Sequence, residues 1–161
     1  MKAVGIVLIV LVLAAAVGLG FLYFNARITV SFVECVATDA VDQAAFFEQL
    51  KAQVENETFI GTRFSRTPLT TPEDCLFYTY TVRVDNRSFL RAEMVEIQMT
   101  PMGGDLLQIG DTTVCNAEAG KATELSATIL TTKEMHNVRE GTVTYYLWGL
   151  PFSTTITLGK K

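Results

Sequence analysis

The feature that most constrains this chain is an uninterrupted apolar segment at its N-terminus. Residues Ala3 to Phe24 carry no charged side chain and almost no polar one. As a helix, these 22 residues would extend about 33 Å at ~1.5 Å per residue, which is enough to cross the ~30 Å hydrocarbon core of a bilayer. We therefore expect residues 3–24 to contact lipid, and residues 1–25 to form a transmembrane anchor.

A cleaved secretory signal peptide is the alternative interpretation of this segment. The small residues at positions 14–16 would suit a signal peptidase, but the apolar run continues beyond them to spanning length. Tyr23 and Phe24, followed by Arg27, have the pattern of an aromatic membrane interface and a polar exit. These features favour an uncleaved signal-anchor.

The remainder, residues 26–161, fits one domain, because domains commonly contain ~100–150 residues. Lys2 and the α-amino group flank the apolar run on one side, and on the other side Arg27 is followed by no basic residue before Lys51. The positive-inside rule then predicts a cytoplasmic N-terminus and an extracytoplasmic domain. With 13 basic and 17 acidic residues, the chain offers no electrostatic case for nucleic acid.

Alternation of apolar and polar residues predicts a mainly β domain. In the first strand, residues 28–36, the apolar face includes Val36 and excludes Cys35. Residues 38–54 change to a helical period, with Thr38 or Asp39 as the N-cap. Further strands are expected within 76–84, 90–99, 106–109, 122–131, 141–149 and 152–158, the last two as a hairpin with a turn at residues 149–151.

About seven strands with short connections and one inserted helix fit an Ig-like antiparallel β-sandwich. A single antiparallel sheet with the helix packed across it is the alternative. One strand changes phase: apolar residues occupy even positions from Leu90 to Met94 and odd positions from Val95 to Met99. Because the side-chain period of a strand is two, this change predicts a β-bulge or a bend near Met94–Val95.

The three cysteines, Cys35, Cys75 and Cys115, form no C-x-x-C motif and no zinc-type spacing. Cys35 ends one predicted strand and Cys75 begins another. These two are therefore candidates for a disulfide across an antiparallel pair, if the domain lies in an oxidising compartment. Three buried or half-buried free thiols are an equal alternative.

Aromatic side chains on strands are the candidate partner-binding residues. Tyr78 and Tyr80 lie on one predicted strand, and Tyr146 and Trp148 lie on another. Alternation places Tyr146 and Trp148 opposite the aliphatic residues of their strand. One set of side chains then forms the core, while the other would form an exposed aromatic face for a partner. Core packing of both sets is the alternative.

The sequence contains no residue pattern that indicates catalysis. His136 is the only histidine, and no nucleophile or metalloprotease motif accompanies it. The acidic pair Asp39 and Asp42 fits a helix N-terminus, and Glu73 and Asp74 fit a turn. We therefore expect no enzymatic activity, no metal and no cofactor.

Residues 78–111 carry a further pattern. A strand ends in V-x-V-x-N at residues 82–86, a turn follows, and the next strand leads to a turn containing glycine at residues 103–105. This layout resembles the immunoglobulin- or fibronectin-III-like sandwiches of the LEA14/WHy type, although Arg87 follows Asn86 where that family has proline. The resemblance implies a sandwich fold and transfers no catalytic residue.

These features together predict a membrane-anchored, non-catalytic binding or scaffolding module. Such a module would be a subunit of an envelope complex, with a protein partner near the membrane surface. A stress-protective LEA14-like accessory protein is the alternative, followed by an enzyme without a recognisable motif. Because the first strand begins soon after Phe24, the domain is expected to lie close to the bilayer.

Overall fold

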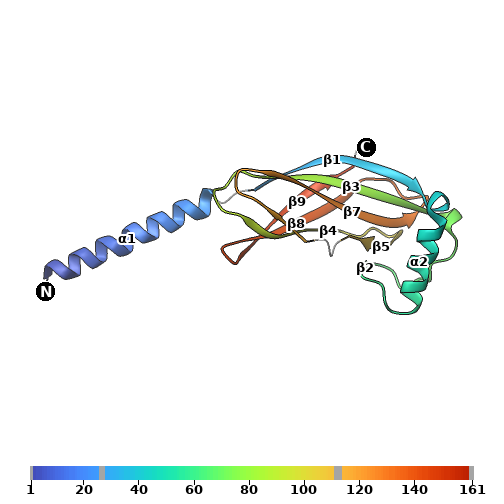
Figure 1. The fold of residues 1–161 in the computed structure, drawn as a ribbon, viewed down its shortest axis with the longest axis horizontal. Coiled ribbons are helices and arrows are strands. Elements are labelled where there is room, and N and C mark those ends of the chain that lie inside the picture. Colours follow the sequence, from blue (N-terminus) through green and yellow to red (C-terminus); the bar gives the residue numbers. More distant parts are fainter. Residues whose placement is uncertain (1, 26–27, 111–113, 160–161) are drawn as a thin grey trace.

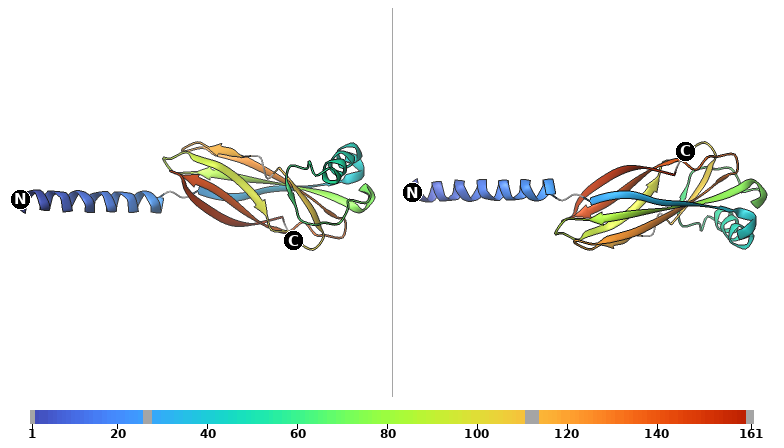
Figure 2. Two further views of the ribbon diagram at one scale, coloured as in Figure 1. Left: turned by 90° about the horizontal axis from the view of Figure 1, so that it is seen from below. Right: turned by 90° about the horizontal axis from the view of Figure 1, so that it is seen from above.

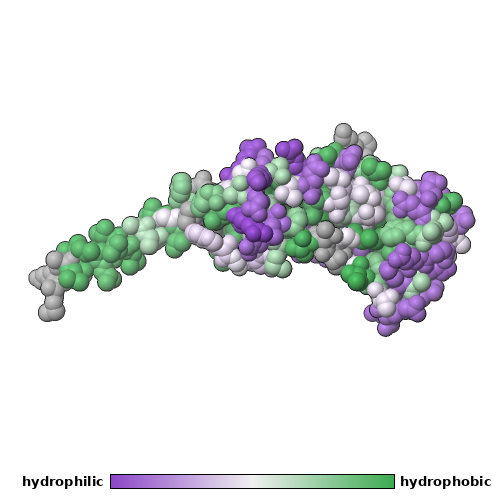
Figure 3. Space-filling view, in the orientation of Figure 1, coloured by the Kyte–Doolittle hydropathy of each residue, from purple (hydrophilic) through white to green (hydrophobic). Residues whose placement is uncertain are grey.

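The computed structural model describes residues 2–25, 28–110 and 114–159. Its first element, α1 (Lys2–Asn25), projects from one end of a β domain (Figure 1). Within it, Val4–Phe21 is long and apolar enough to cross a membrane, and none of that stretch is buried in the protein. Figure 3 shows the same contrast, with a hydrophobic helix leaving a domain of mixed polarity.

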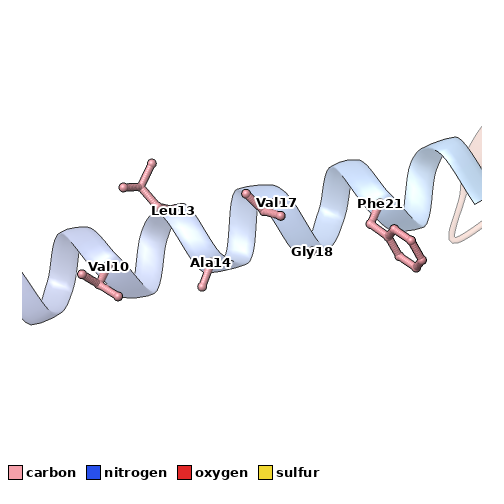
Figure 4. Close-up of a pocket in the computed structure, with 6 residues that line it drawn as sticks. All are labelled: Val10, Leu13, Ala14, Val17, Gly18 and Phe21. Carbon is pink, nitrogen blue, oxygen red and sulfur yellow. The ribbon is translucent and has the colours of Figure 1, made fainter.

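One face of α1 forms a shallow apolar groove, drawn in Figure 4. Ala14 and Gly18 lie one turn apart in it, so the side chains that line the groove are smallest at that level. Its lining consists of Val10, Leu13, Ala14, Val17, Gly18 and Phe21. The predicted interfacial residue Arg27 and the side chains of Tyr23 and Phe24 lie outside the described residues.

The domain contains nine strands, one α-helix and two short 3-10 helices in the part that the structure describes. In chain order these are β1 Ile28–Asp39, η1 Ala40–Gln43, α2 Ala44–Glu55, β2 Thr62–Arg63, η2 Pro72–Asp74, β3 Cys75–Asn86, β4 Ala92–Met99, β5 Asp105–Ile109, β6 Cys115–Ala117, β7 Ala122–Thr132, β8 Arg139–Leu147 and β9 Leu150–Leu158.

The strands form two antiparallel sheets packed face to face. The five-stranded sheet has the order β1-β3-β7-β5-β2, and the four-stranded sheet has the order β6-β4-β8-β9. This arrangement confirms the predicted mainly β, two-sheet architecture, and the single-sheet alternative is wrong. Two strands were not predicted, β2 and β6, because strands of two and three residues are too short to show an alternating pattern.

The interior between the sheets is built by the alternating residues that the sequence indicated. On β3 the inward side chains include Val82 and Val84, and on β8 they include Val143 and Leu147, all of them buried. A second apolar cluster lies on the outer side of the five-stranded sheet, where Phe47 of α2 is fully buried against that sheet. The helix therefore covers one sheet only, at the end far from α1 (Figure 2).

The predicted helix exists, but it begins later than expected. Thr38 is still paired in β1, and α2 starts at Ala44 after the 3-10 turn. Asp39 makes no side-chain cap hydrogen bond. Asp39 does occupy the N-cap of that 3-10 turn, but its carboxylate forms an ion pair with Lys133, with Nζ to Oδ1 at 2.7 Å, and caps no backbone N–H. The ion pair with Lys133, which follows β7, thus uses the carboxylate that a side-chain cap would need.

A bulge in β1 overturns two further expectations. Phe32 pairs with Val82 and Glu34 with Thr81, so Val33 is an extra residue that reverses the phase of the strand. Cys35 therefore packs against the core, and Val36 is turned outward and exposed. The predicted apolar face that included Val36 is wrong beyond the bulge.

The predicted disulfide between Cys35 and Cys75 is also contradicted. The first strand continues past residue 36 to Asp39, and its register places Cys35 opposite Tyr80 rather than opposite Cys75. Tyr80 and Cys75 are five positions apart along β3, about 17 Å at ~3.4 Å per residue. All three cysteines are free thiols.

The bulge predicted in the fourth strand is confirmed. Glu93 pairs with Tyr146 and Glu96 with Thr144, so Met94 and Val95 together oppose one residue of β8. Met94 has a φ of 52°, in the left-handed region, which lets the strand accommodate the extra residue.

The predicted hairpin of β8 and β9 is also present, with its turn one residue earlier than expected. Leu147 pairs with Leu150, which leaves Trp148 and Gly149 as the two turn residues. Their φ values are 53° and 73°, as a type I′ turn requires. The turn thus brings Trp148 out of the strand and to the tip of the hairpin.

Strand register also determines what lies next to α1. Ile28 pairs with Asn86, and the Asn86 backbone N–H donates to Lys121, so the loops 87–91 and 118–121 lie beside the start of β1. The β8–β9 turn reaches the same end of the sandwich (Figures 1 and 2). We call this the α1 end, and the opposite end, which carries α2, the far end.

Candidate functional site

The four candidate aromatic residues lie in two different places. Tyr78 and Tyr80 point from β3 into the interior between the sheets, where Tyr80 is fully buried. Their hydroxyls donate to the backbone carbonyls of Met135 at 3.0 Å and Asn137 at 2.8 Å. Both tyrosines therefore hold the loop between β7 and β8 from inside, a structural task that leaves Tyr80 no surface for a partner.

The thiol of Cys35 lies beside Tyr80, its register partner on β3. Burial raises the pKa of the Tyr80 hydroxyl well above its ordinary value of 10.0. Burial also raises the pKa of the Cys35 thiol, although a hydrogen bond with Tyr80 acts in the opposite direction. Both groups consequently stay neutral at physiological pH, and Cys35 lacks the thiolate that nucleophilic chemistry requires.

A buried ion pair lies at the start of β8. The Arg139 guanidinium donates to both carboxylate oxygens of Asp105, from Nη2 at 2.7 Å and from Nε at 2.9 Å, and neither side chain is exposed. Arg139 also donates to the carbonyls of His136 and Val138, while Asp105 accepts the Met102 N–H. These contacts pair both charged groups within the protein and connect the loop before β5 to the loop before β8.

The side chain of His136 contacts the backbone of its own loop. Its side chain is exposed on the loop before β8, and its Nδ1 accepts the backbone N–H of Val138 at 3.2 Å. Among the residues that the structure describes, no group of three or more His, Cys, Asp or Glu side chains is placed to hold a metal ion.

The other two candidates, Tyr146 and Trp148, lie at the α1 end. Tyr146 is half-buried on the outer face of the four-stranded sheet, while Trp148 at the hairpin tip is 61% exposed. Three more apolar side chains at this end are similarly exposed, namely Phe89 at 57%, Met94 at 55% and Leu150 at 53%. We refer to Phe89, Met94, Trp148 and Leu150 as the apolar tip residues.

The loop that carries Phe89 is held from below by a buried asparagine. The Asn86 amide Nδ2 donates to the carbonyls of Leu90 and Ala117, each at 2.8 Å. Its Oδ1 accepts the backbone N–H and the hydroxyl of Ser88, at 3.1 and 2.7 Å. Because the loop is fixed on both sides of Phe89, the exposed ring is presented by an ordered scaffold.

Charged residues at the α1 end balance one another. Arg87 pairs with Asp85 at 3.2 Å, and Arg91 pairs with Glu118 at 3.3 Å. Both ion pairs lie at the surface, so each contributes little to stability. The tip residues are thus framed by arginine side chains without a strong net charge.

Of the apolar tip residues, only Trp148 was predicted from the sequence as a candidate for partner binding. The Trp-Gly pair at 148–149 was a usable signal, because a two-residue turn with Gly in second place would have put Leu150 in the first pair of the hairpin. Phe89 follows a turn-forming Asp-Asn-Arg-Ser run, which indicates a loop but not an exposed ring. Their gathering at one end follows from strand register alone.

Comparison with known proteins adds little. No protein-family model and no curated protein matches this chain. Among solved structures, a match is the crystal structure of the cupredoxin domain of amoB from Nitrosocaldus yellowstonii, with 11% identity, a TM-score of 0.31, and coverage of 82% of this chain and 88% of that chain. The β-sandwich of this chain is established by its own two sheets, and the predicted LEA14/WHy kinship gains no support.

Proposed function

We propose that this chain is a membrane-anchored, non-catalytic binding or scaffolding module, displayed on the extracytoplasmic side as part of an envelope complex. One observation carries the proposal: only residues 26 and 27 separate the end of α1 at Asn25 from the start of β1 at Ile28. Three peptide steps span at most about 11 Å. A domain on so short a connection is held at the membrane surface, where it can position a partner.

The state of the polar interior supports binding over catalysis. Arg139 and Asp105 form an ion pair and are fully buried, and the Tyr80 hydroxyl donates to the backbone carbonyl of Asn137. An active site requires titratable groups that converge on an accessible pocket. Arg139, Asp105 and Tyr80 instead hold loops in place.

The outer face of the four-stranded sheet is the surface we favour for the partner. Helix α2 packs on the other sheet, so it does not cover this face. Tyr146 lies there between its register neighbours Glu93 of β4 and Pro151 of β9, and the exposed Thr155 lies farther along β9. A surface that combines an aromatic ring with threonine and glutamate side chains has the mixed polarity of a transient protein interface.

The partner proposal is tested by site-specific photo-crosslinking of the full chain in its native membrane. A photoreactive residue at Tyr146 or Thr155 should yield a discrete protein adduct that co-purifies from detergent. The same residue at Thr81, on the outer face of the five-stranded sheet, serves as the matched control. Adducts of equal yield from all three positions, or from none, would contradict the proposal.

The side of the membrane is tested separately with protease added to intact cells. We expect the β domain to be accessible to the protease, because the weak positive-inside signal at Lys2 favours export of the C-terminal part. Protection of the domain until the membrane is permeabilised would place it in the cytoplasm and overturn this part of the proposal.

A further inference from the structure

We propose that the α1 end of the sandwich is a seat on the bilayer, in which Trp148, Leu150 and Phe89 insert into the headgroup region of the membrane that holds α1. The occupant of this surface is lipid, and the seat fixes the orientation of the domain. This inference rests on the proposed membrane anchoring and is independent of any protein partner.

The apolar tip residues lie at the end of the domain that is joined to α1. The pairing of Ile28 with Asn86 places the Phe89 loop directly beside the strand that leaves the membrane helix. The β8–β9 turn lies at the same end, because Tyr146 pairs with Glu93 at the start of β4. With only residues 26 and 27 between α1 and β1, this end of the domain cannot move far from the bilayer surface.

The exposed side chains at this end have the chemistry of a membrane interface. Tryptophan concentrates at membrane–water interfaces, where its apolar ring and its N–H donor are both accommodated. Trp148, Leu150, Phe89 and Met94 are each more than half exposed, so water faces apolar surface that lipid could cover. The far end also exposes apolar side chains, Ile60 at 73% and Val41 at 46%, but it carries no tryptophan, and hydrophilic surface surrounds α2 there (Figure 3).

The backbone conformation at the hairpin tip is unusual for a tryptophan. Trp148 has a φ of 53°, a region in which glycine and asparagine are favoured over bulky side chains. A large aromatic residue at that position is therefore not explained by the stability of the turn. Contact with lipid explains it, because the turn places the indole beyond the last residue pair of the hairpin.

Electrostatics determine which lipids the seat requires. Arg87 and Arg91 flank Phe89, and each is paired with an acidic neighbour, Asp85 or Glu118. Their guanidinium groups can reach phosphate groups, yet the end as a whole carries little net charge. The seat therefore depends on apolar insertion, and a zwitterionic bilayer should be sufficient for it.

Trp148 is the only tryptophan in the chain, so its own fluorescence reports the seat. The full chain is placed in phosphatidylcholine nanodiscs, with or without lipids that carry a nitroxide quencher near the headgroup. We expect a blue-shifted Trp148 emission, protection from acrylamide, and strong quenching by the nitroxide lipid. A red, acrylamide-accessible emission without nitroxide quenching would overturn the seat.

A far-end reporter controls for general proximity to lipid. In the double variant Trp148→Phe with Ile60→Trp, the single tryptophan replaces a residue that is 73% exposed between α2 and β2. Its emission should remain red-shifted and unquenched by the nitroxide lipid. Equal quenching of both reporters would show that the domain lies flat on the bilayer or moves freely, and the proposed seat would be wrong.

A second variant tests the insertion itself. Phe89→Ser with Leu150→Ser should reduce nitroxide quenching of Trp148 and restore its access to acrylamide, while thermal unfolding in detergent stays unchanged, because both side chains are exposed. Ile60→Ser is the matched control and should leave the quenching as it was. Unaltered quenching in the double serine variant would contradict the seat.

Further measurements distinguish failure of the proposed seat from loss of membrane anchoring and from a protein bound at the same surface. Flotation of the nanodisc-free chain with liposomes tests anchoring by α1, and its failure would overturn the proposed function together with the seat. A protein occupant of the same surface would be detected as protection of Trp148 from acrylamide without nitroxide quenching, which would overturn lipid as the occupant while anchoring remains intact.

Discussion

At the scale of single residues, the domain depends on buried polar groups that link distant segments. Gln108 of β5 donates from Nε2 to the Ile97 carbonyl at 2.9 Å and accepts the Met99 N–H at 2.8 Å, so its side chain bridges the two sheets. Arg139 and Asp105 join loops that are 34 residues apart in sequence. Each of these groups is enclosed, so its loss would leave an unpaired polar partner in the core.

The ion pair gives the largest expected effect of a single substitution. Arg139→Met leaves the Asp105 carboxylate buried without its partner, which should lower the free energy of unfolding by about 3–5 kcal/mol. Chemical denaturation of the full chain in detergent, followed by circular dichroism, measures the loss. Lys133→Met, which breaks the surface pair with Asp39, is the control and should cost far less. Equal losses would show that burial of the pair is unimportant.

Tyr80 predicts a dependence of stability on alkaline pH. In the unfolded chain its hydroxyl titrates near 10.0, whereas burial raises the pKa of Tyr80 in the folded domain. Above pH 10.0 the unfolded state therefore releases a proton that the folded state retains, and the free energy of unfolding falls as the pH rises.

The Tyr80→Phe variant tests the origin of this decline. It should weaken the domain at neutral pH by about 1 kcal/mol, because the bond to the Asn137 carbonyl is lost. Above pH 10 its stability should fall less steeply than that of the native chain, as measured by denaturation at several pH values. Parallel pH profiles would assign the decline to other groups.

At the scale of elements, irregular backbone positions decide which side chains reach the surface. The extra residue Val33 in β1 exchanges the roles of Cys35 and Val36, and the bulge in β4 exposes Met94. The hairpin turn does the same for Trp148. In all three places the strand pattern is interrupted and an apolar residue faces outward, so these irregularities shape the surface without disturbing the core.

The turn offers a prediction that separates stability from membrane contact. Trp148→Asn places a residue that tolerates positive φ in the type I′ turn, and the free energy of unfolding in detergent should rise by a few tenths to about 1 kcal/mol. Leu150→Asn removes a neighbouring exposed apolar side chain outside the left-handed region, so it should bring no such gain. A destabilised Trp148→Asn variant would mean that the indole packs on the domain itself.

At the scale of the whole molecule, the two ends of the sandwich are chemically different. The α1 end carries the apolar tip residues, and the far end carries α2 over a second apolar cluster. A helix of membrane length continues directly from the former (Figure 1). In the proposed seat, the α1 end is the side that faces the membrane and the far end is the side that faces solvent.

We predict that the mature protein retains α1. The intact mass of the chain purified from membranes should include residues 1–25, because the apolar run continues past the small residues at 14–16 to spanning length. Mass spectrometry of the purified chain measures it. A mass corresponding to a start near position 17 would identify a cleaved signal peptide and remove the anchor.

Much of this architecture could be read from local pattern. The N-terminal run, the inserted helix, the hairpin and the bulge near Met94 are all written in the order of apolar and polar residues, because burial on one face imposes a fixed period. The bulge in β1 could not be read in this way. Val33, Cys35 and Val36 are all compatible with burial, so no change of phase appears in the sequence.

Sequence by itself determined that this chain has a membrane-length helix joined closely to an antiparallel β domain, since both features depend on periods of a few residues. Only the tertiary structure decided that Arg139 meets Asp105, that Tyr80 turns inward, and that Phe89, Trp148 and Leu150 gather beside α1. The physical reason is that strand register and sheet order bring together residues far apart in the chain, and no local period encodes which residues will meet.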